Sequence, residues 1–121
     1  MFDFISIIVP VWREGRRINR LLHHLQGLAG SRRSEVIVVD GSPRRETLAA
    51  VAVEGVRLVA APRGRGRQMN AGARLAGGDI LLFLHADTLL PPDGLPWVRR
   101  ICALPGVAGG AFDLGICAEG F

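Results

Sequence analysis

Residues 64–88, GRGRQMNAGARLAGGDILLFLHADT, contain the two patterns that decide the fold. The segment 67–76 suits a helix, which Gly77 and Gly78 end. The segment 80–84 (ILLFL) is the most apolar of the predicted strands. We therefore expect a helix followed by a strand, with the polar segment HADT directly beyond the strand's carboxyl end.

The sequence on the amino-terminal side repeats this alternation. Apolar runs predict strands at residues 4–9, 35–40 and 56–60. Apolar residues spaced three and four positions apart predict a helix at residues 14–28, and residues 44–53 suit another. Strands that alternate with helices over short connections predict an α/β fold with a mostly parallel sheet and ligands beyond the carboxyl ends of its strands.

Beyond residue 90 the pattern is weaker. A short helix is expected within residues 91–104, with Trp97, Val98, Ile101 and Cys102 as its buried face, and a further strand at 109–114. Cys102 and Cys117 form no CxxC pair and lack histidine partners at metal-ligand spacing. We expect two buried free thiols rather than a zinc or redox site.

Length and composition indicate an ordinary globular protein. The 121 residues suffice for one compact domain, which we place at residues 1–121, and 49% of them are hydrophobic against 21% charged. Asp3 stands where a signal peptide carries positive charge, and the first apolar run stops at Pro10, far short of a membrane span. A cytoplasmic protein is expected, with peripheral membrane association as an alternative.

All 15 basic residues are arginine, and the net charge is +4. Such an excess favours anionic partners such as phosphates, although genomic codon bias also explains the choice of Arg over Lys. A nucleic-acid-binding domain is one alternative that the charge leaves open. Few aromatic residues and dispersed arginines count against it, so no nucleic-acid partner is expected.

Polar residues follow three of the predicted strands. Glu14 follows the first, Asp40 ends the second, and His85 and Asp87 follow the ILLFL strand. Asp40 followed by Gly suits contact with a base or a ribose, but equally a turn or a helix cap. Asp87 suits Mg²⁺ or Mn²⁺ against a diphosphate, with a plain turn residue as the alternative, and a strand-end histidine is often structural.

The loop before the predicted helix has arginines at 63, 65 and 67 among glycines, so guanidinium groups and helix amides there could share an anion. A solvated basic loop is the alternative. The glycine spacing fits neither GxGxxG nor a P-loop, and no GxSxG nucleophile signature is present.

Four blocks, ISIIVPVWRE, EVIVVDGS, residues 64–88 and the later GGAF, resemble successive blocks of family 2 glycosyltransferases over about residues 5–112. The resemblance implies a GT-A fold and a nucleotide-diphosphate sugar donor, most readily a UDP-sugar. It also implies a divalent cation, Mn²⁺ or Mg²⁺, bound by Asp87 of a DxD-like motif. The residues that it assigns to donor binding are Pro10, Glu14, Asp40, Arg67, Asn70, His85, Ala86 and Asp87.

The chain departs from the family at two positions. Arg13 replaces the usual Asn before Glu14, and His85 stands at the first position of the DxD motif, which leaves one carboxylate for the metal. One carboxylate is workable, because phosphate oxygens and water can complete the shell. The block around residues 68–88 looks closest to the branch involved in arsenosugar biosynthesis.

The implied reaction is transfer of a sugar to an acceptor hydroxyl, with inversion and with the metal and arginine stabilising the leaving diphosphate. The catalytic base is expected beyond residue 121, together with the acceptor-binding half. A non-catalytic nucleotide-binding fragment or module, completed by a partner, is the alternative. Loss of a covering half would also expose apolar surface and favour a homo-oligomer.

Overall fold

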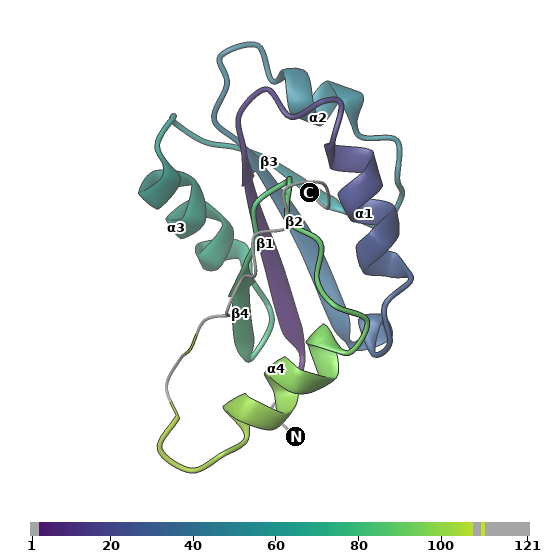
Figure 1. The fold of residues 1–121 in the computed structure, drawn as a ribbon. Coiled ribbons are helices and arrows are strands. Elements are labelled where there is room, and N and C mark those ends of the chain that lie inside the picture. The colour runs from purple at the N-terminus through teal and green to yellow at the C-terminus, as the bar shows by residue number, and fades with distance from the viewer. Residues whose placement is uncertain (1–2, 108–109, 111–121) are drawn as a thin grey trace.

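The computed structural model describes residues 3–107 and 110. They form an α/β domain in which strands and helices alternate along the chain (Figure 1). The elements are β1 (Ile5–Val11), α1 (Ile18–Gln26), the 3₁₀ helix η1 (Ser31–Arg33), β2 (Ser34–Asp40), α2 (Glu46–Ala50), β3 (Arg57–Ala60), α3 (Arg65–Leu75), β4 (Ile80–Phe83) and α4 (Gly94–Cys102).

The described strands form one four-stranded parallel sheet in the order β3-β2-β1-β4. β1 pairs with β2 from Ile5–Ser34 to Val11–Asp40 and with β4 from Ile5–Ile80 to Ile8–Phe83. Because all strands run the same way, their carboxyl ends meet at one edge. The sheet confirms the predicted fold class, and the expected strand at 109–114 lies outside the described residues except for Gly110.

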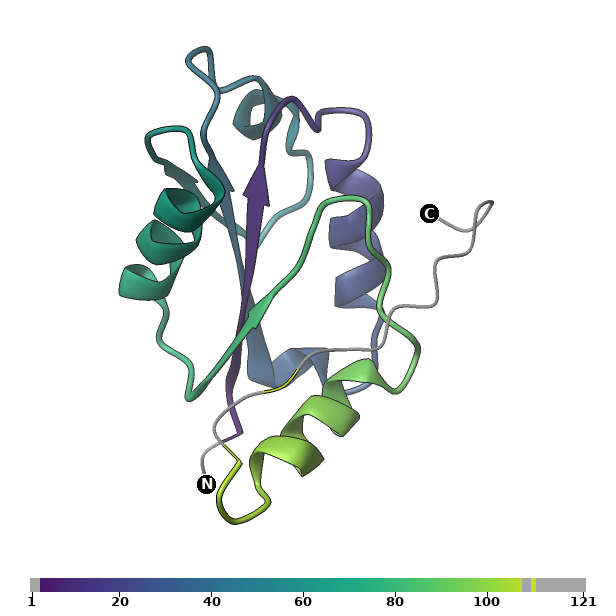
Figure 2. The same ribbon diagram turned by 60° about the vertical axis from the view of Figure 1, so that its left-hand side comes forward.

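Helices cover both faces of the sheet, as Figure 2 shows with α3 on one side and α1 on the other. The face toward α1 holds the larger core, built from alternate β1 residues and the apolar stripe of α1: Ile5, Ile7, Val9, Val11, Ile18, Leu21, Leu22 and Leu25. The face toward α3 is thinner and packs Ile8, Ile37, Val39 and Ala61 against the alanines of the helix. None of the described helices is both long and apolar enough to cross a membrane.

α1 and α2 are shorter than the sequence predicts, whereas α3 begins earlier. α1 begins at Ile18 rather than near Glu14, because the Glu14 carbonyl accepts hydrogen bonds from the amides of Arg17 and Ile18 and forms a turn before the helix. α3 begins two residues earlier than expected, at Arg65, and this brings an additional arginine into its first turn.

The prediction for the buried face of α4 is confirmed for Val98, which is partly buried against the core, and is wrong for Trp97 and Ile101, which are exposed at 46% and 37%. Gly94 and Leu95 are the buried residues of this helix. Cys102 is a free but exposed thiol, so its predicted burial is also wrong. The helix contacts the core through Leu95 and Val98, and Ile101 in its last turn is not part of that core.

A polar cluster ties the amino-terminal edge of the sheet together, opposite the carboxyl edge. The Glu35 carboxylate accepts hydrogen bonds from the Ser6 hydroxyl at 2.6 Å and the Gly77 amide at 2.7 Å, and Arg57 lies 3.6 Å away. Burial alone would raise the pKa of Glu35, but the two hydrogen bonds and Arg57 together lower it below its ordinary value. Glu35 is therefore held ionised as part of the scaffold.

Gly72 allows α3 to approach the sheet closely, and we expect Gly72→Ala to lower the free energy of unfolding by about 1–3 kcal/mol. A Cβ at this position would lie 2.5 Å from Ile8 Cγ2 and 3.1 Å from Val39 Cγ2. Urea unfolding measures the change. Gly66→Ala in the same helix is the control, since a Cβ there meets nothing within 4 Å, and it should raise stability by up to about 1 kcal/mol. A stabilising Gly72→Ala would contradict the close packing.

Candidate functional site

β1, β2 and β4 end, and α3 begins, along one edge of the sheet (Figure 1), and Glu14, Asp40, His85 and Asp87 are at or just beyond these strand ends. β1 and β2 end side by side, with Val11 paired to Asp40, and the Leu84 amide still donates to the Ile8 carbonyl just beyond β4. The HADT segment therefore leaves the sheet beside the β1 end. This carboxyl edge is where an open α/β sheet binds ligands.

Asp40 is fully buried at this edge, and its carboxylate is occupied by local hydrogen bonds. Oδ1 accepts from the amide and the hydroxyl of Ser42, both at 2.8 Å. Oδ2 accepts from the amides of Thr47 and Leu48 at 3.1 and 3.2 Å. Of the two readings that the sequence left open, this geometry supports the turn and helix cap, and a direct donor contact stays a prediction.

Glu14 lies on the loop between β1 and α1, where its amide donates to the Thr47 hydroxyl at 2.9 Å. Its carboxylate forms an ion pair with Arg17 at 3.4 Å, and 25% of the Glu14 side chain is exposed. Pro10 is half-buried within β1 and is paired with Val39. Glu14 is thus accessible to a ligand at the carboxyl edge, whereas Pro10 is part of the strand that leads to this edge.

Gln68 is a residue that the sequence reasoning missed. It is buried, with 5% exposure, and its amide Nε2 donates to the carbonyls of Val11 and Val39, both at 2.9 Å. Its Oε1 accepts from the Gly64 amide at 3.2 Å. One side chain therefore joins the ends of β1 and β2 to the loop before α3. The signal available in the sequence was that Gln68 precedes Gly72 by four residues and so lies on the same, sheet-facing side of the predicted helix.

Trp12, directly after β1, is a second residue that the sequence reasoning did not assign. The guanidinium of Arg63 lies 4.0 Å from the centre of its ring and that of Arg13 lies 5.2 Å away. Both distances are within the range of cation–π attraction. The loop before α3 is thereby held against the β1 end, and an aromatic ring lies at the ligand-binding edge.

The first turn of α3 reaches His85 through Arg65. Nη2 of Arg65 lies 3.2 Å from Nδ1 of His85. A guanidinium has only donors, so Nδ1 accepts, and the ring in this arrangement carries its proton on Nε2. Arg65 and His85 together present N–H donors at the edge of the sheet.

The two α3 residues assigned by resemblance lie on the exposed surface of the helix. Arg67 is exposed in the first turn, with its aliphatic part over Gly64, and Asn70 is exposed further along the helix. Because α3 runs away from the carboxyl edge, Arg67 lies nearer to it than Asn70. The structure brings Arg65, rather than Arg67, to His85.

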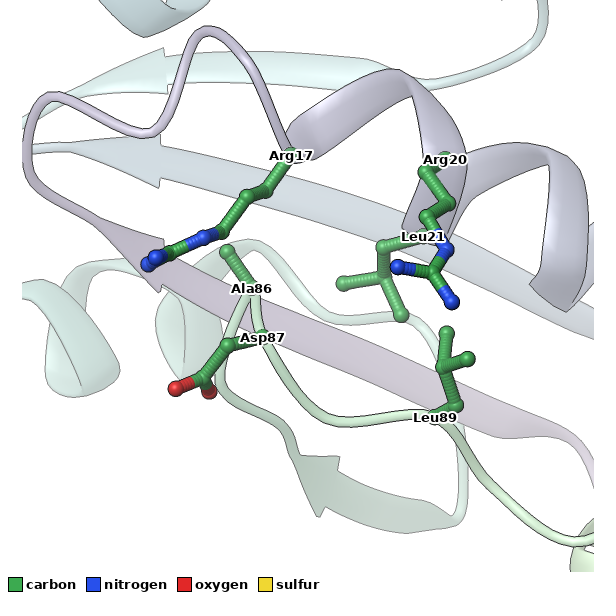
Figure 3. A pocket seen from close by; sticks show the side chains of 6 residues that line it. All are labelled: Arg17, Arg20, Leu21, Ala86, Asp87 and Leu89. Carbon is green, nitrogen blue, oxygen red and sulfur yellow. The ribbon is translucent and has the colours of Figure 1, made fainter. Parts of the chain in front are cut away.

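Asp87 lines a small pocket on the α1 side of the HADT segment (Figure 3). The other lining residues are Arg17, Arg20, Leu21, Ala86 and Leu89. Ala86 is buried in the core between the exposed side chains of His85 and Asp87. The pocket has a volume of about 60 Å³, far below the roughly 300–1,000 Å³ of sites that enclose a drug-sized ligand. It accommodates one small group.

Asp87 is the candidate metal ligand, and its carboxylate is largely available. Among the described residues it accepts a hydrogen bond from the Thr88 hydroxyl at 3.4 Å. No three His, Cys, Asp or Glu side chains within residues 3–107 and 110 gather as a metal site. A single accessible carboxylate fits Mg²⁺ or Mn²⁺ that is shared with a phosphate ligand, since such ions keep water and phosphate oxygens in their shell.

We expect Asp40→Asn to lower the free energy of unfolding by about 2–3 kcal/mol, because an amide nitrogen would face backbone or hydroxyl donors in place of one carboxylate oxygen. Chemical denaturation measures the loss. Glu46→Gln, a matched change at an exposed position of α2 whose ion pair with Arg13 spans 3.8 Å, should cost less than about 1 kcal/mol. Unchanged stability together with weakened nucleotide binding would show instead that Asp40 contacts a ligand.

Comparisons with known proteins agree on one family. The sequence profile described as glycosyl transferase family 2 matches residues 6–112. The chain is 30% identical over 105 residues to the undecaprenyl-phosphate 4-deoxy-4-formamido-L-arabinose transferase of Pseudomonas paraeruginosa, a match that covers 78% of this chain and 31% of that protein.

Two similar solved structures hold nucleotide sugars. One is the mannosyltransferase PcManGT from Pyrobaculum calidifontis in complex with GDP-Man and Mn²⁺, with a TM-score of 0.70, 26% identity, and coverage of 86% of this chain and 33% of that one. The other is S. aureus TarS in complex with UDP-GlcNAc, with a TM-score of 0.67, 25% identity, and coverage of 80% and 30%. The chain thus spans about a third of the length of these relatives, and it belongs to glycosyltransferase family 2.

Proposed function

We propose that this chain binds a nucleotide-diphosphate sugar at the carboxyl edge of its sheet and serves in transfer of the sugar to an acceptor hydroxyl, with inversion. The observation that carries the proposal is the position of Asp87, exposed at that edge beyond β4 and two residues from His85, which contacts Arg65 of α3. A carboxylate that can hold a cation and a group of N–H donors are the two parts that a diphosphate site needs.

The relatives support this assignment of ligand class. PcManGT holds GDP-Man with Mn²⁺, and TarS holds UDP-GlcNAc. These two ligands share a diphosphate but differ in base and sugar, so they favour a diphosphate site without deciding the rest. A UDP-sugar donor and membership of the arsenosugar branch stay predictions of the sequence.

The residues around the HADT segment suit a leaving diphosphate. Arg65, Arg67 and the Nε2–H of His85 would donate to phosphate oxygens and stabilise the charge that develops on them. A divalent cation on Asp87 would neutralise part of the same charge when bound. Asn70, further along α3, would contact the nucleotide sugar outside its diphosphate. His85 thus supplies a hydrogen-bond donor at the position where the family's usual motif has a second carboxylate.

The transfer forms a bond between the acceptor oxygen and the anomeric carbon as the bond from that carbon to the diphosphate oxygen breaks. The diphosphate leaves with the electron pair, and the acceptor proton must pass to a general base. The carboxylates that follow the GGAF block in this sequence, Asp113 and Glu119, lie outside the described residues, and the base is expected beyond residue 121.

Trp12 and Glu14 follow β1 and are suited to the nucleoside. A base would stack on the Trp12 ring in place of the Arg63 guanidinium, which lies 4.0 Å from the ring centre, and the accessible Glu14 carboxylate offers acceptors for base N–H or ribose hydroxyl groups. Asp40 would act from behind, by holding the turn after β2 through its hydrogen bonds to Ser42, Thr47 and Leu48.

If Asp87 holds the cation, Asp87→Asn should weaken Mn²⁺-dependent binding of UDP or GDP by at least about 10-fold, because the neutral amide is a much poorer ligand for a hard cation. Calorimetry with and without Mn²⁺ measures the effect. Asp79→Asn, at the opposite end of β4, is the matched control and should bind like the wild type. Equal metal dependence in Asp87→Asn and wild type would exclude Asp87 as the ligand.

Stacking on Trp12 predicts that Trp12→Leu weakens nucleotide binding by about 1–3 kcal/mol, or roughly 5- to 150-fold, as measured by the same titrations. Trp97→Leu serves as the control, since Trp97 is exposed on α4 and pairs with Asp93 away from this edge. Wild-type affinity in Trp12→Leu would show that the base does not use this ring.

A further inference from the structure

The pocket beside Asp87 has a wall of positive charge that the donor site does not use. Arg20 of α1 and Arg17, directly before α1, line it, whereas Arg65 of α3 contacts His85 of the HADT segment. Figure 3 shows Arg17 and Arg20 on the same side of the segment that carries Ala86, Asp87 and Leu89. Basic groups therefore lie near the HADT segment on both the α1 face and the α3 face of the sheet.

The charge on the α1 side is only partly compensated. Arg17 shares the Glu14 carboxylate at 3.4 Å, while its side chain is 63% exposed. Arg20 makes no ion pair with any residue of the part of the chain that the structure describes. The first turn of α1 also has no acidic residue. A cation bound to Asp87 would remove the remaining negative charge from the pocket wall and leave it strongly positive.

The size of the pocket indicates what such a wall can take. At about 60 Å³ it holds one compact group, not a sugar or a base. Leu21, Ala86 and Leu89 form its apolar part, so a ligand there is partly removed from water. Guanidinium groups bind phosphate and carboxylate oxygens through paired hydrogen bonds, and these are stronger where water is partly excluded.

We propose that Arg17 and Arg20 form a subsite for an anionic group of the acceptor, of phosphate-ester type. The proposal rests on the function proposed above, because the donor diphosphate then occupies the α3 side and the acceptor enters from the α1 side. A phosphate ester held next to Asp87 places the acceptor's hydroxyl beside the leaving group of the donor. The acceptor class is therefore a phosphorylated alcohol, either small and free or presented by a lipid headgroup.

The test is a titration of the 121-residue chain with glycerol 1-phosphate in the presence of Mg²⁺, followed by the Nε–Hε resonances of arginine in NMR spectra. We expect saturable shifts for Arg17 and Arg20 and none with glycerol. Arg20→Gln should weaken the binding by about 10-fold, the range expected for loss of a charge-assisted hydrogen bond. Arg16→Gln, an exposed arginine of the same basic segment that does not line the pocket, should bind like the wild type.

A second arm separates the two sources of phosphate. Co-sedimentation with phosphatidylcholine vesicles, with and without phosphatidic acid, tests a lipid headgroup against the soluble ester. Binding to either one that depends on Arg20 supports the subsite, and binding to neither overturns it.

The binding of UDP or GDP with Mn²⁺ to the same variants separates the subsite from the donor site. Nucleotide affinity should be unchanged in Arg20→Gln. An equal loss of nucleotide and glycerol phosphate binding would assign the pocket to the donor diphosphate and overturn the proposal. Failure of wild type to bind nucleotide, with Arg20-dependent phosphate binding intact, would instead refute the donor site and leave an anion site on α1.

Discussion

The hydrogen bonds of the Gln68 amide are the interaction on which the geometry of the site depends. Nε2 donates to the carbonyl of Val11, the last residue of β1, and to that of Val39, next to the last residue of β2, and Oε1 accepts from the Gly64 amide at the start of α3. With the side chain at 5% exposure, loss of any partner would leave a buried polar group unsatisfied. The loop and helix that carry Arg63, Arg65 and Arg67 are therefore fixed relative to the sheet before any ligand binds.

The arrangement held by the Gln68 hydrogen bonds requires the backbone to come close to neighbouring atoms at two positions, and only glycine permits this. A Cβ at Gly41 would lie 2.6 Å from Gln68 Oε1 and 3.1 Å from the Arg63 Cα, so the turn after β2 must lack a side chain for the loop to cross it. Gly72, one helical turn beyond Gln68, lets α3 rest on Ile8 and Val39. Backbone packing thus determines where the arginines of this loop and helix, and therefore their positive charges, lie relative to the sheet.

The strands could be predicted from their continuous apolar runs, which are buried in β1 and β2, and the carboxyl ends of the strands then locate the edge where ligands bind. The contacts of individual side chains could not be predicted from the sequence. The helix start at Arg65, which selects Arg65 over Arg67 as the partner of His85, depends on Gln68 reaching the strands. Asp40 looks like a ligand-binding carboxylate in sequence, and only three-dimensional contacts show the hydrogen bonds that bury it.

The substitution of His85 for a carboxylate changes how a cation and a nucleotide would depend on each other in the proposed site. A lone Asp87 supplies too few ligands to hold Mn²⁺ or Mg²⁺ firmly, so most of the shell must come from diphosphate oxygens and water. Binding free energies are reciprocal, so the factor by which the diphosphate strengthens cation binding is also the factor by which the cation strengthens nucleotide binding. With Arg65 and His85 already providing N–H donors, the nucleotide retains part of its affinity without the cation, whereas the cation retains little without the nucleotide.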